Sequence, residues 1–190
     1  MTILIPGSVR SIGSDSYKYG NMIDIGNIGY TETGAFEKCE SLTSVTIDDG
    51  GDAIMSIGRY TFLDCKRLES VQIGDSVISI GTGAFKNCTS LTNVTIANNL
   101  KVIGSADGDG VYGGAFQNCS VLINITIPDN VTSINASTFL ECNARLSAEY
   151  KGETYLAEQW GNWVILDTGE ELSDVYNLPQ VFYDAVNDRK

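Results

Sequence analysis

Five cysteines are the residues of this chain best suited to covalent or metal chemistry, and all five recur in one sequence context. Each follows a phenylalanine by three residues, in the pairs Phe36 and Cys39, Phe62 and Cys65, Phe85 and Cys88, Phe116 and Cys119, Phe139 and Cys142. An odd number excludes complete pairing within the chain, and the long spacings differ from the Cys-x-x-Cys pairs of zinc sites. Because free cysteine packs as a small apolar residue, the pattern predicts a buried ladder of free thiols. Disulfides and metal binding are the alternatives.

Other catalytic chemistry has little support. The chain contains no histidine, the commonest general base and metal ligand. No Ser-x-x-Lys or nucleophile-elbow motif accompanies its serines and cysteines. The segment Asp107–Gly110 opens like a calcium loop but lacks the third acid and the distal glutamate that an EF-hand needs. The sequence therefore predicts a non-enzymatic protein without a cofactor or a metal ion.

Two tryptophans, Trp160 and Trp163, could present an aromatic platform to a sugar or a peptide. Aliphatic residues surround them, including Leu156 and the run 164–166, and this favours burial. A carbohydrate-binding site at these aromatic residues is kept as an alternative.

The segments that position these residues repeat along the chain. Successive phenylalanines of the motif are separated by 26, 23, 31 and 23 residues, which gives a unit of 23 residues with insertions of three and eight. The insertions fall within 48–53 and 104–114. A period of this size is typical of a solenoid, in which each coil buries its apolar side against its neighbours. We expect the insertions to lengthen surface loops and to leave the contacts between coils intact.

Each unit contains three parts. Leu91, Val94 and Ile96 and their equivalents alternate as in a β-strand. A second apolar segment follows, as in Val77 to Ile80, and the Ala-Phe-x-x-Cys piece suits a single helical or 3₁₀ turn. The prediction is a mainly β solenoid with a parallel ribbon of strands about 4.8 Å apart.

The outward positions of this ribbon are the candidate binding surface. They carry small, neutral groups that can form hydrogen bonds, without the tryptophan, tyrosine or arginine typical of binding hot spots. These positions are Ser44, Thr46, Ser70, Gln72, Asn93, Thr95, Asn124 and Thr126. The alternative is a threonine-rich ladder selected for β-propensity and solubility.

The repeats divide the chain into two predicted domains. Residues 1–146 form the solenoid, with a partial first unit at 3–13, an insertion at 14–33 that packs over the open end or the flank, and units from 34 onward. Residues 147–190 form a C-terminal cap with short strands around Lys151 and Gly152 and a terminal helix near 178–187.

The net charge and the hydropathy of the chain argue against several classes of partner. The formal net charge of −12 argues against nucleic acid, whose phosphates need clustered basic residues, and against anionic membrane surfaces. No apolar run approaches the ~20 residues of a membrane-spanning helix, and no signal peptide is visible at the N-terminus. The oligomeric state is left open.

The repeat A-F-x-x-C-x-x-L-x-x-V-x-I-P-x-x-V-x-S-I-G resembles the BspA-like leucine-rich repeat family, in four full copies and two partial ones covering most of 3–146. Pro6 and Pro128 occupy the family's proline position, where Asp48, Gly74 and Ala97 stand in the other units. The resemblance implies a leucine-rich-repeat solenoid from secreted or surface proteins of bacteria and some protists, with roles in adhesion and no enzymatic activity in the repeats.

We therefore expect a protein-interaction or adhesion module of an extracellular or cell-surface protein. Its ligand would be a protein, such as a host or matrix protein. A carbohydrate-binding module that uses Trp160 and Trp163, or a structural spacer without its own ligand, are the alternatives.

Overall fold

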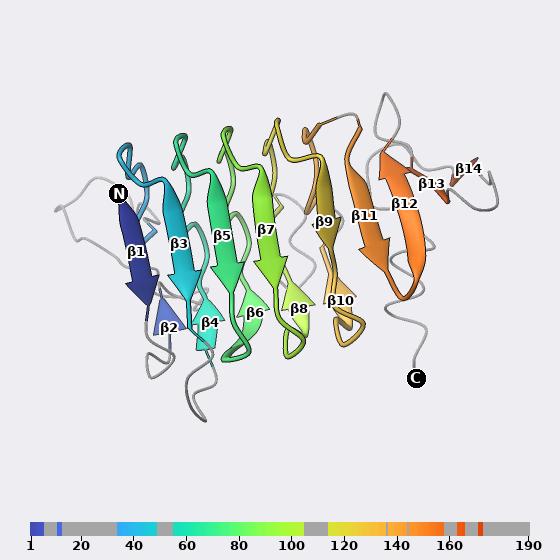
Figure 1. The fold of residues 1–190 in the computed structure, drawn as a ribbon, viewed down its shortest axis with the longest axis horizontal. Coiled ribbons are helices and arrows are strands. Elements are labelled where there is room, and N and C mark those ends of the chain that lie inside the picture. Colours follow the sequence, from blue (N-terminus) through green and yellow to red (C-terminus); the bar gives the residue numbers. More distant parts are fainter. Residues whose placement is uncertain are drawn as a thin grey trace, which may run out of the picture.

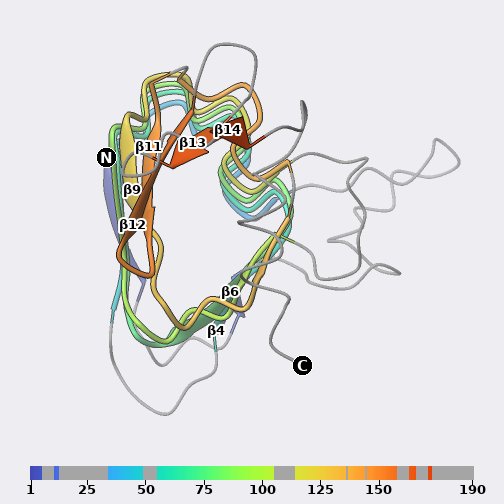
Figure 2. The ribbon, with the colours of Figure 1, turned by 90° about the vertical axis from the view of Figure 1, so that its right-hand side faces the viewer.

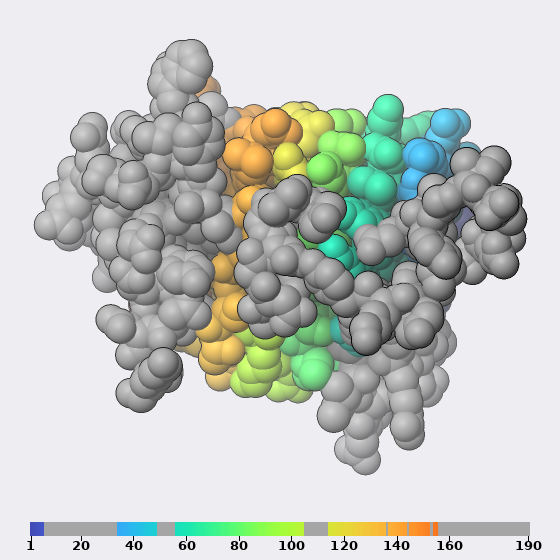
Figure 3. Space-filling model, turned by 180° about the vertical axis from the view of Figure 1, so that it is seen from behind, coloured from blue at the N-terminus to red at the C-terminus, as the bar shows by residue number. Residues whose placement is uncertain are grey.

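The computed structural model describes residues 1–5, 11–12, 34–48, 55–104, 114–135, 137–143, 145–157, 163–165 and 171–172. Within these ranges the chain forms the predicted solenoid, with successive coils side by side along one axis (Figure 1). When the molecule is viewed along that axis, the strands and turns of successive coils superimpose (Figure 2). From behind, the coils form adjacent bands in chain order (Figure 3).

Two parallel sheets form two sides of each coil. The first has the order β1 (Thr2–Ile5), β3 (Ser44–Ile47), β5 (Ser70–Ile73), β7 (Asn93–Ile96). The second has the order β10 (Ser133–Ile134), β8 (Val102–Ile103), β6 (Val77–Ile80), β4 (Met55–Ile57), β2 (Ser11–Ile12). The β-branched residues of both predicted segments explain these strands, because they pack well on a pleated surface.

The third side of each coil is a turn. The Cys88 N–H donates to the Phe85 carbonyl (3.3 Å) and the Leu91 N–H to the Cys88 carbonyl (3.0 Å). These bonds have the spacing of a 3₁₀ turn, as predicted. They do not continue into a helix, since the residue before each cysteine has a positive φ. This holds at Lys38, Asp64, Asn87, Asn118 and Glu141.

A column of stacked phenylalanine rings fills the core beside these turns. It consists of Phe36, Phe62, Phe85, Phe116 and Phe139, with ring centroids 5.3, 5.2, 5.2 and 5.8 Å apart and interplanar angles of 5° to 11°. The inward residues of the strands, such as Leu42, Val71 and Ile73, are buried against it. Each coil thus buries its apolar side mainly against its neighbours.

The cysteines form the predicted ladder of free thiols, buried at Cys65, Cys88 and Cys119 and half-buried at the two ends. From Cys65 on, each thiol donates to a carbonyl of the preceding coil: Cys65 to Phe36 (3.0 Å), Cys88 to Phe62 (3.3 Å), Cys119 to Phe85 (3.3 Å) and Cys142 to Phe116 (3.1 Å). This contact gives a reason for cysteine at the position, because it combines an apolar volume with a weak donor.

Burial makes these thiols difficult to ionise. It raises the pKa of Cys65 to about 11 and raises the pKa of Cys88 well above its ordinary value. The pKa of Cys119 is raised by a hydrogen bond with Cys142 and by burial. Since the thiolate is the reactive form, the buried thiols are structural groups at neutral pH.

A third sheet continues the solenoid beyond the last coil. Its order is β14 (Glu171–Leu172), β13 (Trp163–Ile165), β12 (Glu153–Ala157), β11 (Ser147–Tyr150), β9 (Asn124–Thr126). Strands β11 and β12 form the hairpin expected around Lys151 and Gly152, whose φ angles of 51° and 81° fit a type I′ turn. Strand β11 pairs in parallel with β9, so the hairpin is bonded directly onto the last coil.

We expected the insertions to leave the contacts between all coils intact, and for the pairing of the ribbon strands this expectation is wrong. The eight-residue insertion leaves the second sheet and the phenylalanine column intact, but strands β7 and β9 do not pair and belong to different sheets. We call this break between residues 93–96 and 124–126 the seam. The domain boundary at 146/147 stays a prediction, and the insertion at 14–33 and the helix near 178–187 lie outside the described residues.

Candidate functional site

The outward sides of β1, β3, β5, β7, β9 and β11 form one surface, which we call the ribbon face. Strand register aligns its side chains in two rows. One row runs Thr2, Ser44, Ser70, Asn93 and, beyond the seam, Asn124 and Ser147. The other runs Leu4, Thr46, Gln72, Thr95 and, beyond the seam, Thr126 and Glu149.

All eight residues predicted from the sequence lie in these rows. Gln72, Asn93, Thr95, Asn124 and Thr126 are exposed, whereas Ser44, Thr46 and Ser70 are half-buried. Near the N-terminal end the hydroxyls bond to one another, with Thr2 Oγ1 and Ser44 Oγ 2.7 Å apart. Among the eight predicted positions, the side chains available to a partner therefore concentrate toward the seam and beyond it.

The continuation of this surface onto the hairpin was not predicted from the sequence. Ser147 and Glu149 occupy outward positions of β11, while Ala148 and Tyr150 between and after them are buried. The alternation in 147–150 was the available signal, although its spacing from Leu146 differs from that in the earlier units. Glu149 is the one ionisable side chain at the outward positions of the six described ribbon strands, which leaves the rest of the face neutral.

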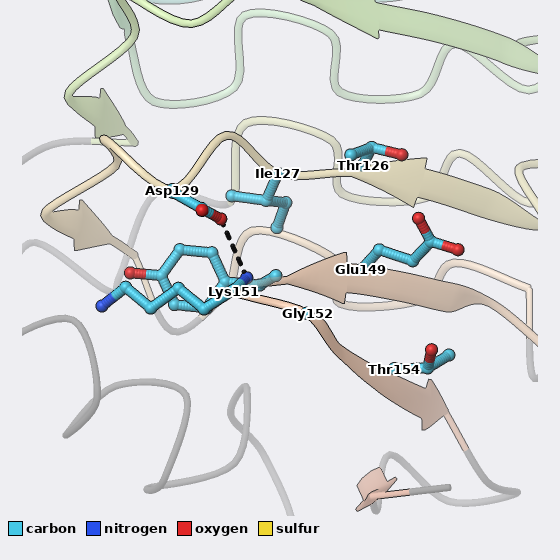
Figure 4. Close-up of a pocket in the computed structure, with 8 residues that line it drawn as sticks. Thr126, Ile127, Asp129, Glu149, Lys151, Gly152 and Thr154 are labelled. Carbon is cyan, nitrogen blue, oxygen red and sulfur yellow. Dashed lines mark hydrogen bonds between the residues drawn. The ribbon is translucent and has the colours of Figure 1, made fainter.

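A shallow pocket of about 330 Å³ opens at the ends of β9, β11 and β12 (Figure 4). Thr126, Glu149 and Thr154 line one side of it and are neighbours across the three strands. At the other side the Lys151 N–H donates to Asp129 Oδ1 (3.1 Å), and the Lys151 ammonium lies 4.7 Å from the centroid of the Tyr150 ring.

Much of this pocket has a structural explanation. The Asp129 carboxylate holds the hairpin turn, and the Tyr150 hydroxyl donates to the Val131 carbonyl (3.0 Å). The free hydrogen-bonding capacity lies with Thr126, Glu149 and Thr154, which belong to the ribbon face. The pocket is best regarded as the end of that face.

The remaining sequence candidates contribute less. In the described ranges, no three or more Cys, Asp or Glu side chains are grouped so that they could hold a metal ion, and none of the described segments is a helix that could cross a membrane. Trp160 and the segment 107–110 lie outside the described residues. Trp163 begins β13, whose backbone pairs with β12 and β14, and its role stays a prediction.

Comparison with known families assigns the repeats. The BspA type leucine-rich repeat region matches residues 11–145 in six copies. The chain belongs to this family. The match agrees with the six repeats, two of them partial, found in the sequence.

Solved structures agree with this assignment. The chain resembles a leucine-rich repeat protein of T. pallidum, with a TM-score of 0.53 and 22% identity over 77% of this chain and 56% of that one. It also resembles a leucine-rich repeat protein from Bacteroides ovatus, with a TM-score of 0.51 and 30% identity over 79% of this chain and 33% of that one. The chain thus spans about half and one third of the lengths of these structures. Comparison with curated proteins finds no match.

Family membership also sets the broad class of function. BspA-type leucine-rich repeat proteins are non-enzymatic repeat proteins, and leucine-rich repeat proteins generally act as protein-interaction modules. This class agrees with a surface that carries regularly spaced hydrogen-bonding groups.

Proposed function

We propose that the ribbon face binds a protein ligand and that the chain is an adhesion module of a secreted or cell-surface protein. The observation that carries the proposal is the pair of in-register rows on the ribbon face, exposed at Gln72, Asn93, Thr95, Asn124 and Thr126. The scaffold beneath them is packed by the phenylalanine column, so the groups on each side of the seam are held in place relative to one another before a partner arrives. Such preorganisation reduces the entropy lost on binding.

The chemistry of the face supports a protein ligand over a polysaccharide. Its outward positions, from Thr2 to Glu149, include no aromatic side chain on which a sugar ring could stack. Hydroxyl and amide groups can bond to the main chain and polar side chains of another protein, and the two rows allow many such bonds at once. The extracellular or cell-surface location is proposed from the resemblance of the repeats.

A binding screen with one matched pair of variants tests the proposal. The chain is applied to immobilised host matrix proteins such as fibrinogen, fibronectin and laminin, and the affinity for any ligand found is measured. Thr95→Arg changes the centre of the ribbon face, whereas Thr132→Arg makes the same change at an exposed residue next to the second sheet. We expect Thr95→Arg to weaken binding at least about tenfold, which is about 1.4 kcal/mol, and Thr132→Arg to leave it nearly unchanged.

Three results would contradict the proposal. Equal losses for the two variants would place the binding site elsewhere on the molecule. Failure to bind any protein in a broad screen would favour a structural spacer. A change in tryptophan fluorescence on titration with a polysaccharide would favour the carbohydrate site at Trp160 and Trp163.

A further inference from the structure

The seam is the place where the ribbon lacks the hydrogen bonds found between its other strands. The Ser44, Ser70 and Asn93 N–H groups donate to carbonyls of the preceding coil, as do those of Thr43, Glu69 and Thr92. The equivalent groups beyond the seam are the N–H groups of Ile123 and Asn124, and they make no such bond to Thr92. Beyond β9 the pattern resumes, since the Ser147 N–H donates to the Ile123 carbonyl (2.9 Å).

The sequence explains in part why these backbone hydrogen bonds are missing between β7 and β9. At the other end of each strand, one backbone N–H donates to an isoleucine carbonyl of the preceding coil. These donors are Asp48, Gly74 and Ala97, at 2.9, 3.0 and 2.9 Å. Pro128 stands at the equivalent position beyond the seam and has no N–H to donate to Ile96. The eight-residue insertion lies in the same step of the solenoid, which spans 31 residues instead of the basic 23.

Packing beneath the seam is looser than elsewhere in the ribbon. Val94 is 8% exposed, whereas the equivalent Val45 and Val71 are 1% and 2% exposed. Ile96 is half-buried, whereas Ile47 and Ile73 are each 1% exposed. The inward residues of β7 are therefore more exposed than their equivalents in β3 and β5, whereas Ile125 of β9 and the following Ile127 are buried.

The other two sides of the same step are closed. In the second sheet, the Thr132 N–H donates to the Lys101 carbonyl and the Asn135 N–H to the Ile103 carbonyl, both at 2.8 Å. At the turns, the rings of Phe85 and Phe116 stack at 5.2 Å. The coils on either side of the seam are thus joined by backbone hydrogen bonds and ring stacking along two sides, whereas along the third β7 and β9 lie next to each other without pairing.

We propose that the seam is a hinge, about which the ribbon strands β1–β7 and β9–β12 move apart and together. The second sheet and the phenylalanine column form its axis. Motion at this step breaks no backbone hydrogen bond of the ribbon, whereas the same motion between any other described pair of ribbon strands would break a ladder. Hinge motion of packed units at such a weak step is a common form of conformational change.

The motion alters the ribbon face at its centre. Thr95 and Thr126 lie on opposite sides of the seam, as do Asn93 and Asn124, and these four are among its exposed residues. Opening and closing would change the spacing between the two halves of each row. The inference concerns the motion itself and does not depend on the proposed ligand.

Spin-label distance measurements with two matched cysteine pairs test the hinge. The pair Gln72→Cys and Glu149→Cys spans the seam, from β5 to β11. The control pair Leu4→Cys and Thr95→Cys spans the same number of strands, from β1 to β7, without crossing it. All four positions are exposed and outward, and the wild-type chain, labelled in parallel, reports any reaction of the native thiols.

We expect the pair across the seam to give a two-peaked distance distribution, or one at least about twofold wider than the control. Equally narrow, single-peaked distributions for the two pairs would overturn the proposal. Amide exchange of the unmodified chain provides an independent measurement: Ile123 and Asn124 should exchange much faster than Glu69 and Ser70. Equal protection at these positions would show a closed ladder and would also overturn it.

Discussion

The turn side and the ribbon face of the same coils differ in which of their groups contact the neighbouring coil. On the turn side, rings, thiols and even the polar residue before each cysteine contact the neighbouring coil. Asn87 Nδ2 donates to Asp64 Oδ1 (2.9 Å), and Asn118 Nδ2 donates to Asn87 Oδ1 (3.0 Å). On the ribbon face only every second residue points inward, and the ladder itself is broken at the seam. Stability is therefore concentrated at the turns, which leaves the outward ribbon positions free to vary.

Removing a ring from the phenylalanine column should have the largest effect. Phe85 is fully buried between two rings, so we expect Phe85→Ala to lower the free energy of unfolding by about 3–5 kcal/mol. Chemical denaturation followed by circular dichroism measures this. Phe36, which is half-buried, provides the control, and an equal loss for Phe36→Ala would contradict the dependence on burial.

A side-chain atom added where two turns approach closely should have the next largest effect on the free energy of unfolding. A Cβ atom added to Gly114 would lie 1.7 Å from the Ser137 carbonyl oxygen, so one backbone must move. We expect Gly114→Ala to cost up to about 3 kcal/mol, as overpacking does. Gly152→Ala is the control, because no atom lies within 4 Å of its added Cβ and only its φ of 81° opposes the change. A smaller loss at Gly114 than at Gly152 would show that the turns are loosely packed.

Alkaline pH should weaken the turn side selectively. The pKa of the buried thiols is raised above the ordinary value of 9.0, so the folded chain keeps these protons to higher pH than the unfolded chain does. Stability is then complete below pH 9.0 and decreases above it, by up to about 1.4 kcal/mol per pH unit for each fully buried thiol. Denaturation at several pH values measures the slope. Cys88→Ala should reduce it, and an unchanged slope would contradict the assignment to the thiols.

Substitution on the ribbon face should have the smallest effect on stability. Thr95 is exposed, and we expect Thr95→Ala to change the free energy of unfolding by less than about 0.5 kcal/mol. Val94→Ala, at the adjacent inward position, should cost several times more. A thermal melt of both variants makes the comparison, and a large loss at Thr95 would mean that the ribbon face is structural.

Sequence alone predicted the turn side and most of the ribbon. Phe85, Cys88 and Leu91 recur at fixed spacing, and a recurring apolar residue can be buried only if each coil repeats the geometry of the one before. The outward positions follow from alternation within each strand. The single helical or 3₁₀ turn was also predictable from the short length of the Ala-Phe-x-x-Cys piece.

The seam was not predictable, because β9 keeps the complete pattern of Leu122, Ile125 and Ile127. A repeat pattern specifies which residues point inward, and it does not specify how far one coil tilts from the next. Pro128 removes a single donor, and Pro6 occupies the same position in the first unit. The Phe85 and Phe116 rings stack at 5.2 Å, as in the neighbouring step, so the break is confined to the ribbon and no single residue encodes it. The extension of the ribbon face to Glu149 was missed because the spacing from Leu146 changes there.

The asparagines of the turns have a consequence for how the chain can be produced. Asn87 and Asn118 each begin an Asn-x-Ser/Thr sequence, as do Asn93 and Asn124 on the ribbon face. The amide nitrogens of Asn87 and Asn118 are engaged as donors between coils, whereas Asn93 and Asn124 are exposed. In a eukaryotic secretory pathway Asn93 and Asn124 would therefore be acceptors for N-linked glycans on the ribbon face. Chain from a bacterial host would present that face bare.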